Sequence, residues 1–312
     1  MSRRIGILGY GRMGAPVARR LREHGFDVTV SDVDEEALQR ARADRLPTAP
    51  DGAALAARSD TLITVLPGPI ECREALLGAG GALGGLAPGG VWLDFTSNDP
   101  RSVATLVAEA ERRGIGAVAA PLRGGPADAA AGTLGFYLGG DTAAVHEVTD
   151  VLVALGHDAA TPVAQSEPAL AHVAKLVANT LWFGQVIAVT EVLLLGRALG
   201  WEPSALRGAL LESPGASAFL ERHGPALLAG DRMPDFPLGR VVEELETVLR
   251  LAEEAGTPHE TIALVTRLHR EALASFGDVD GELLAAALLE ERAGRPLAAD
   301  AAPGRGGPAE TG

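Results

Sequence analysis

A glycine-rich segment near residue 10 constrains the fold more than any other feature of the sequence. The stretch IGILGYGRMGAPVARRL places Gly9, Gly11 and Gly14 in G-x-G-x-x-G spacing, after an apolar run and before a helical pattern. In a dinucleotide-binding unit the first glycine makes a tight turn, the second lets a pyrophosphate approach the backbone, and the third lets the helix pack closely on the strand. The amino terminus of that helix then faces the phosphates. The segment therefore predicts a Rossmann-type βαβ unit.

The residues around this loop favour one dinucleotide over the other. Asp32 ends the next predicted strand, DVTVSD, where a carboxylate can accept hydrogen bonds from both ribose hydroxyls and would repel a 2′-phosphate. We therefore expect NAD rather than NADP. The alternative for Asp32 is a turn or cap residue. Arg12, beside Met13 in the loop, either neutralises the pyrophosphate or is a solvated residue of the first helical turn.

The order of apolar patterns along the chain predicts two domains. From residue 3 to about 162, helical stretches alternate with short apolar runs: RIGILG, DVTVSD, DTLITVLP, GGVWLDF and GIGAVAAP. This alternation predicts an α/β Rossmann domain (residues 1–162) with a doubly wound, mostly parallel sheet. The remaining pattern predicts an all-α domain (163–293) for substrate binding and oligomerisation, joined by a long interdomain helix. Its expected helices span residues 167–199, 203–212, 215–229, 237–255, 258–275 and 280–293. The Gly- and Pro-rich tail (294–312) is expected to be disordered.

Charge and cysteine usage narrow the possible partners. The formal net charge of −14 gives no general attraction for nucleic acid or anionic membranes. Gln185 and Glu191 interrupt the most apolar window, residues 180–196, so we expect a buried or interface helix there and not a membrane span. A single cysteine, Cys72, and no Cys/His cluster of ligand spacing predict neither an internal disulfide nor a metal site. No secretory pattern is visible near Met1, so we expect a cytoplasmic protein that acts on small molecules.

Five segments in fixed order resemble one enzyme family. They are GILGYGRMGAPVARRL, TLITVLP, DFTSNDP, APLRGGPADAAAGTLGFYLGG and HVAKLVANTLWFGQ. Together they resemble the β-hydroxyacid dehydrogenases, the family of 3-hydroxyisobutyrate dehydrogenase and tartronate semialdehyde reductase, from residue 4 to about 290. The resemblance implies a Rossmann domain, a helical carboxyl-terminal domain and a homodimer or homotetramer. It also implies metal-free hydride transfer between NAD(P) and a hydroxy acid or its semialdehyde.

The resemblance assigns roles to individual residues. It implies that Lys175 is catalytic and that Asn179, one turn later, hydrogen-bonds the substrate. It implies that Leu66 and Pro67 form the loop under the cofactor and that Thr96 and Ser97 touch its nicotinamide half. The glycine pair Gly124 and Gly125 becomes the turn that faces the substrate.

Lys175 stands out without any comparison. It is the only lysine in a chain with 27 Lys and Arg residues, and it lies on an apolar helical pattern. Oxidation of a hydroxyl group releases a proton that an amine can accept and return, which a guanidinium cannot do. The alternative is a structural salt bridge. Asn179 could instead form an interhelical hydrogen bond, and His172, one turn earlier, could join the site or be a satisfied core histidine.

Two departures from the family pattern bear on the substrate. Arg123 stands where the family has a serine, and Glu243 stands where it has a second lysine. Arg123 could bind a substrate carboxylate, phosphonate or phosphate, which would leave Glu243 free to bind an ammonium or hydroxyl group of the substrate. Arg123 could instead pair with Glu243 or point to solvent. We therefore expect an anionic substrate other than hydroxyisobutyrate. Alternative functions are an imine reductase on the same fold and a non-catalytic NAD-binding scaffold, and the presence of Lys175 argues against both.

Overall fold

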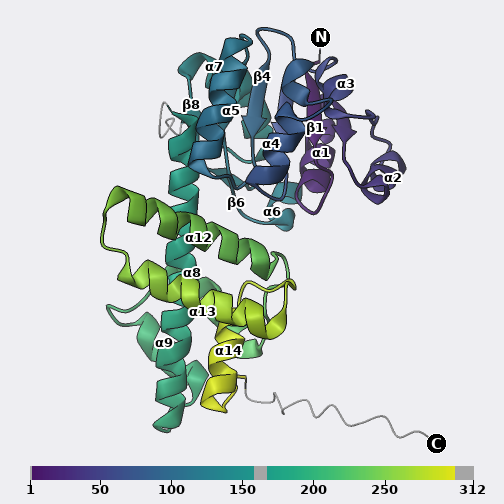
Figure 1. The fold of residues 1–312 in the computed structure, drawn as a ribbon. Coiled ribbons are helices and arrows are strands. Elements are labelled where there is room, and N and C mark those ends of the chain that lie inside the picture. Colours follow the sequence, from purple (N-terminus) through teal and green to yellow (C-terminus); the bar gives the residue numbers. More distant parts are fainter. Residues whose placement is uncertain (1, 158–166, 299–312) are drawn as a thin grey trace, which may run out of the picture. The chain divides into compact units, whose positions relative to one another are not determined.

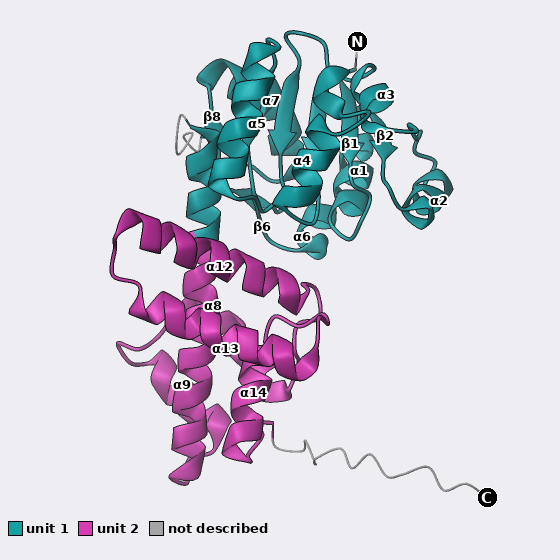
Figure 2. Ribbon diagram, in the orientation of Figure 1, with its two compact units in different colours: residues 1–176 teal, residues 177–312 magenta. Residues whose placement is uncertain are grey.

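The computed structural model describes residues 2–157 and 167–298 and divides into two compact units, Met1–Leu176 and Val177–Gly312 (Figure 2). The division falls inside one helix, α8 (Pro168–Ala198). The expected boundary at 162/163 lies outside the described residues, as does most of the expected tail.

Unit 1, purple to teal in Figure 1, is built on a sheet. This sheet has six strands in the order β2-β1-β3-β4-β5-β8. Every neighbouring pair is parallel except β5 and β8. The order reverses between β1 and β3, and in doubly wound sheets the carboxyl ends of the strands at such a point form the ligand crevice. The strands are β1 (Arg4–Leu8), β2 (Asp27–Ser31), β3 (Thr61–Thr64), β4 (Val91–Asp94), β5 (Gly116–Ala119) and β8 (Gly139–Gly140).

Helices cover both faces of this sheet because its strands are apolar on both sides. Side chains alternate along a strand, so Ile63 and Leu93 join one buried cluster while Leu62 and Trp92 join the other. The first cluster includes residues of α1 and α7, and the second includes residues of α3, α4 and α5. The helices of unit 1 before α8 are α1 (Gly14–Glu23), α2 (Glu35–Ala43), α3 (Gly52–Ala56), α4 (Pro69–Leu77), α5 (Pro100–Arg112), α6 (Pro126–Ala131), α7 (Thr142–Leu155) and the 3₁₀ turn Ala82–Gly84.

A second, two-stranded sheet follows β5 and carries Arg123. Strand β6 (Leu122–Arg123) pairs antiparallel with β7 (Gly135–Phe136), with Arg123 opposite Gly135. Helix α6 lies between these strands in the sequence. The glycine-rich segment at 119–140 is therefore a short ribbon enclosing a helix, followed by the edge strand β8.

Unit 2 is all helical. Its core joins side chains of α8, α12, α13 and α14, among them Phe183, Ile187, Leu245, Leu268 and Leu288. The expected helix at 215–229 is instead two helices, because Pro225 lacks an N–H and occupies the first turn of the second one. The helices after α8 are α9 (Pro203–Leu211), α10 (Ala218–Arg222), α11 (Gly224–Ala229), α12 (Leu238–Ala255), α13 (Glu260–Phe276) and α14 (Leu284–Ala293).

Among the described helices, α8 alone is long and apolar enough to cross a membrane by length and composition. One face of α8, however, supplies Phe183, Val186 and Ile187 to the core of unit 2. A core helix of a water-soluble fold passes the same test of length and apolarity.

Candidate cofactor and substrate site

The three glycines of the loop after β1 meet different surroundings. Gly9 has a φ of 100°, and a Cβ at this position would lie 2.3 Å from the Val65 carbonyl oxygen. A Cβ on Gly14 would lie 2.0 Å from the Gly9 carbonyl oxygen, whereas one on Gly11 would meet nothing within 4 Å. Gly9 and Gly14 are therefore required by the fold itself, while Gly11 leaves an open approach to the backbone.

Asp32 fixes this loop from the end of β2. One carboxylate oxygen accepts a hydrogen bond from the Tyr10 amide at 2.6 Å, and the other accepts one from the Asp34 amide at 2.9 Å. Asp32 thus takes part in the turn before α2, as its alternative interpretation required, and it also holds the loop where a dinucleotide would pass. The side chain is only partly buried, so its remaining lone pairs stay available to a ribose.

Tyr10 anchors the loop through its buried side chain, a role that the sequence did not predict. The ring is 1% exposed, and its hydroxyl donates to the Asp44 carboxylate at 2.6 Å. Burial, together with this hydrogen bond, raises the pKa of Tyr10 to about 12, so the hydroxyl stays protonated and donates. The second position of the G-x-G motif was the available signal, because an aromatic residue there can fill the space beneath the turn.

A cavity of about 360 Å³ adjoins the loop and the first turns of α1. Its wall contains Gly11 and three guanidinium groups, those of Arg12, Arg19 and Arg40. Arg19 also pairs with Asp44 at 2.9 Å. A cluster of guanidinium groups next to open backbone suits a phosphate-bearing ligand.

The loops that follow β3 and β4 meet at the carboxyl edge of the sheet. The Leu66 amide donates to the Thr96 hydroxyl oxygen at 3.2 Å. Thr96 is 2% exposed, while Ser97 beside it is half-buried and Pro67 is exposed. The structure therefore brings together the two loops that the sequence assigned to the cofactor.

A buried carboxylate, Asp94, lies beneath these loops. It is 1% exposed and ends β4. Burial alone would raise its pKa, but His172, Thr64 and the Thr96 amide outweigh burial, so the pKa of Asp94 lies below its usual range. The thiol of Cys72 faces the same group of side chains, and burial raises its pKa, which leaves it protonated and unreactive.

Lys175 lies on the part of α8 that belongs to unit 1. It is half-buried, and no hydrogen bond or ion pair joins it to another residue within 2–157 or 167–298. One turn earlier, His172 is fully buried, and its Nε2 lies 3.4 Å from an Asp94 carboxylate oxygen. The turn of α8 that carries Lys175 is thus next to the end of β4.

Arg123 is exposed and lies over an aromatic ring. Its guanidinium carbon is 5.7 Å from the centroid of the Tyr137 ring, a cation–π distance. The following turn is held by Asp128, whose carboxylate accepts from the Gly125 amide at 2.9 Å. Gly124 has a φ of 115°, which favours glycine there. Tyr137 was not anticipated, because it follows Arg123 by a whole helix in the sequence.

In unit 2, Asn179 and Glu243 have separate partners. The Asn179 amide nitrogen donates to Glu244 at 2.7 Å, so the interhelical hydrogen bond considered from the sequence is present. Glu243 is exposed and accepts from Arg240 at 2.7 Å on the same helix. Glu244, which is 8% exposed, was missed, although it directly follows Glu243 in the segment compared with the family. A pairing of Arg123 with Glu243 would join different units and stays a prediction.

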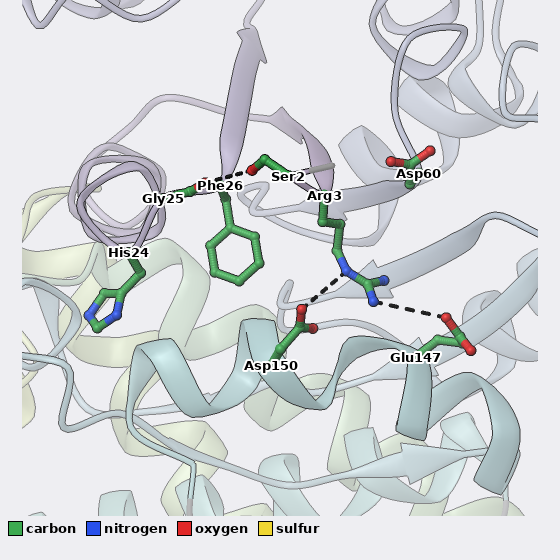
Figure 3. A pocket seen from close by; sticks show the side chains of 8 residues that line it. All are labelled: Ser2, Arg3, His24, Gly25, Phe26, Asp60, Glu147 and Asp150. Atoms are coloured by element: carbon green, nitrogen blue, oxygen red, sulfur yellow. Dashed lines mark hydrogen bonds and ion pairs between the residues drawn. The ribbon is translucent and has the colours of Figure 1, made fainter.

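A larger cavity, of about 520 Å³, lies near the amino-terminal ends of β1 and β2, away from the carboxyl ends that carry the cofactor loops (Figure 3). There Arg3 lies 3.3 Å from Asp150 and 3.9 Å from Glu147. Ligands of doubly wound sheets bind at the carboxyl ends of the strands, so this cavity is not the cofactor site. Within the described ranges, no three His, Cys, Asp or Glu side chains gather as a metal site.

Two family profiles match nearly the whole chain. Residues 4–167 match the NAD binding domain of 6-phosphogluconate dehydrogenase. Residues 169–288 match a family described as NAD-binding of NADP-dependent 3-hydroxyisobutyrate dehydrogenase.

Individual relatives agree with these matches. An NAD-dependent L-serine dehydrogenase of Pseudomonas aeruginosa is 31% identical over 84% of this chain and 90% of that protein. An L-threonate dehydrogenase of Cupriavidus necator is 32% identical over 83% and 86%. The fold resembles that of Mycobacterium tuberculosis 3-hydroxyisobutyrate dehydrogenase with L-serine, with a TM-score of 0.81 at 22% identity, over 92% of this chain and 99% of that one.

Proposed function

Because the chain belongs to the β-hydroxyacid dehydrogenase family of NAD-linked oxidoreductases, we propose that it interconverts a hydroxy acid and the corresponding carbonyl compound, with Lys175 as the general acid and base. One observation carries the assignment of Lys175. The only lysine of the chain follows, by one helical turn, a buried histidine that lies 3.4 Å from the end of β4. The loop that begins there holds Thr96 and Ser97.

The proposed chemistry divides the work between the cofactor and the protein. NAD, when bound, accepts a hydride from the carbinol carbon. The neutral amine of Lys175 accepts the hydroxyl proton in oxidation, and the ammonium returns it in reduction. Asn179 orients the substrate oxygen with the amide atoms that its hydrogen bond to Glu244 leaves available. The charges balance without a metal ion, since one hydride and one proton leave the alcohol.

The cofactor contacts follow from the loop geometry. We propose that the backbone at Gly9, Gly11, Met13 and Gly14 receives the pyrophosphate, and that Asp32 binds the ribose. Leu66, Pro67, Thr96 and Ser97 would lie along the nicotinamide half. Arg12 adds positive charge to the wall of the adjoining cavity, which offsets the phosphate charge.

We propose that Arg123 binds an anionic group of the substrate near Gly124 and Gly125. The contact with Tyr137 holds the guanidinium plane, so less rotational freedom is lost when a carboxylate or phosphate binds. The pairing of Glu243 with Arg240 supports this assignment over an Arg123–Glu243 ion pair. The relatives named for L-serine and L-threonate act on carboxylates, which agrees with an anionic substrate.

A substrate screen tests the proposal. Hydroxy acids such as L-serine, L-threonate and hydroxyisobutyrate, semialdehydes and cyclic imines are assayed with each nicotinamide cofactor. We expect a hydroxy acid or semialdehyde with NAD(H) to be best, and Lys175→Ala to lower kcat by about 100-fold or more while NAD still binds. Arg123→Gln should raise KM for the anionic substrate, whereas Arg240→Gln should not.

The other outcomes identify the alternatives. Full turnover by Lys175→Ala would remove the general acid and base from the mechanism. A cyclic imine as the best substrate would indicate an imine reductase. Tight NAD binding without turnover of any compound would indicate a scaffold protein. We also propose that the chain forms a homodimer or homotetramer, which the exposed apolar residues along α8 support. We further propose that it acts in the cytoplasm.

A further inference from the structure

Asp94 accepts hydrogen bonds that connect the loops of the candidate cofactor site. Its Oδ1 accepts from the Thr64 hydroxyl at 2.7 Å and from the Thr96 amide at 3.0 Å. Its Oδ2 accepts from the Asn98 side-chain amide at 3.2 Å. Thr96 in turn accepts from the Leu66 amide. One carboxylate therefore fixes the backbone of both loops assigned to the cofactor.

The same carboxylate reaches the helix that carries Lys175. Its Oδ2 lies 3.4 Å from His172 Nε2, and the two side chains are 1% and 0% exposed. This separation is long for a hydrogen bond but within ion-pair range. A buried carboxylate is costly without compensation, and within the described residues His172 is the basic side chain that lies within 4 Å of Asp94. The first turns of α8, teal in Figure 2, are thereby joined to the sheet.

His172 takes no part in the proposed proton transfer, but its contact with Asp94 limits how α8 can move. It precedes Lys175 by three residues, so both side chains project from one face of α8. Both ring nitrogens are buried and neither forms a hydrogen bond with a described residue, so the approach of Nε2 to within 3.4 Å of Asp94 is the polar contact that restrains the ring. Rotating or sliding α8 would move Lys175 and break this contact together.

We propose that Asp94 and His172 are positioning residues that fix the Lys175 turn of α8 relative to the two nicotinamide loops. The inference rests on the proposed function, because it assumes that Lys175 transfers the proton. A proton-transfer group displaced by about 1 Å can lose roughly 100-fold in rate. The contact of His172 with Asp94 would therefore act on turnover, whereas Asp94 itself also holds the loops assigned to the cofactor.

The test compares two replacements of His172 with a matched control. His172→Leu removes the polar contact, and His172→Gln retains a nitrogen donor at about the position of Nε2. His269→Leu is the control, since His269 is also 0% exposed but lies in unit 2, with its ring 5.4 Å from that of the core residue Phe183. We expect His172→Leu to lower kcat by about 10- to 100-fold with NAD affinity unchanged, and His172→Gln to restore most of it. The kcat of His269→Leu should stay near that of the wild type.

A second measurement does not depend on turnover. Reductive ¹³C-methylation labels the only lysine, and Lys175→Ala identifies its resonance among those of labelled amines. We expect this resonance to move in His172→Leu and not in His269→Leu. The measurement still tests the pair if the wild type turns over no hydroxy acid, the result that would refute the proposed function instead.

The inference fails if the kcat of His172→Leu and its Lys175 resonance match the wild type. It also fails if His269→Leu changes both to the same extent, because general loosening of the fold would then explain the effect. If His172→Leu does not fold, His172→Ala takes its place: a reduced kcat together with a moved Lys175 resonance supports the pair, and wild-type values of both overturn it.

Discussion

At the scale of single residues, Gly14 and Gly11 of the loop after β1 are expected to differ in role: Gly14 is needed for folding and Gly11 for cofactor binding. Gly14→Ala would place a Cβ 2.0 Å from a backbone oxygen, so we expect a loss of about 1–3 kcal/mol in unfolding free energy. Gly11→Ala places its Cβ in open space, so stability should change by less than about 0.5 kcal/mol. Its methyl group would occupy the approach of the pyrophosphate, so NAD should bind more weakly. Urea unfolding and NAD titration measure both effects.

The comparison of the two variants decides whether the glycines differ in role. Equal losses of stability would contradict the geometry of the loop. Unchanged NAD affinity in Gly11→Ala would show that the pyrophosphate does not approach this backbone.

Residue positions set by local spacing could be predicted from the sequence, whereas long-range partners could not. The glycines and Asp32 act within one βαβ unit, so their order along the chain fixes their geometry. The Asn179–Glu244 hydrogen bond joins residues 65 positions apart. Which face of each helix meets the other depends on packing, and nothing near Glu244 indicates its partner. His172 presented the same difficulty, because strands β5 to β8 and helices α5 to α7 lie between it and its partner Asp94 in the chain.

At the scale of elements, α8 has one buried and one exposed apolar face. Leu181, Val192 and Leu195 are 70%, 47% and 61% exposed. Exposed apolar residues that follow one face of a helix are typical of an interface between subunits. We expect Leu181→Glu combined with Leu195→Glu to convert the oligomer to a monomer, measured by light scattering after size-exclusion chromatography.

The control is Val153→Glu on α7, since Val153 is 46% exposed but lies in unit 1. An unchanged mass of the double variant would show that α8 is not the interface. A monomeric wild type would refute the proposed homodimer or homotetramer.

Elements were predictable where burial imposes a pattern. The first five strands of the main sheet appear as apolar runs because parallel strands are buried on both faces. Strands β6, β7 and β8 have two residues each, and β7 and β8 contain glycine. A strand of two residues is too short to show an alternating pattern in the sequence. The long helix was predictable from its apolar repeat, but the break between α10 and α11 depends on one proline.

At the scale of the whole molecule, the core of unit 2 should be sensitive to mild acid. Burial lowers the pKa of His269 to about 4, whereas an unfolded histidine titrates near about 6.5. Below about pH 6.5 the histidine of the unfolded chain binds a proton, whereas His269 in the folded core stays neutral until about pH 4. The free energy of unfolding therefore falls as the pH drops from about 6.5 toward 4. At pH 5 the expected loss is about 2 kcal/mol.

His269→Gln should remove this part of the pH dependence, and His146→Gln, at an exposed site on α7, should not. Urea unfolding at pH 7.5 and 5.0, followed by tryptophan fluorescence in a Trp92→Phe background, measures the difference within unit 2, which holds Trp182 and Trp201. Equal pH dependence in wild type and His269→Gln would contradict the assignment. Asp94 contributes in another range: its lowered pKa gives stability that is present above about pH 4 and lost below it.

The edges of the main sheet bear on how the chain avoids aggregation. At one edge the β8 strand is only Gly139–Gly140. At the other, Val30 of β2 exchanges hydrogen bonds with the backbone of Pro47 and Ala49, at 3.0 and 2.9 Å. A long, flat, unpaired edge is what recruits strands from other chains, and the described sheet offers none. Folding intermediates in which the sheet has formed should therefore resist cross-β assembly even at high concentration.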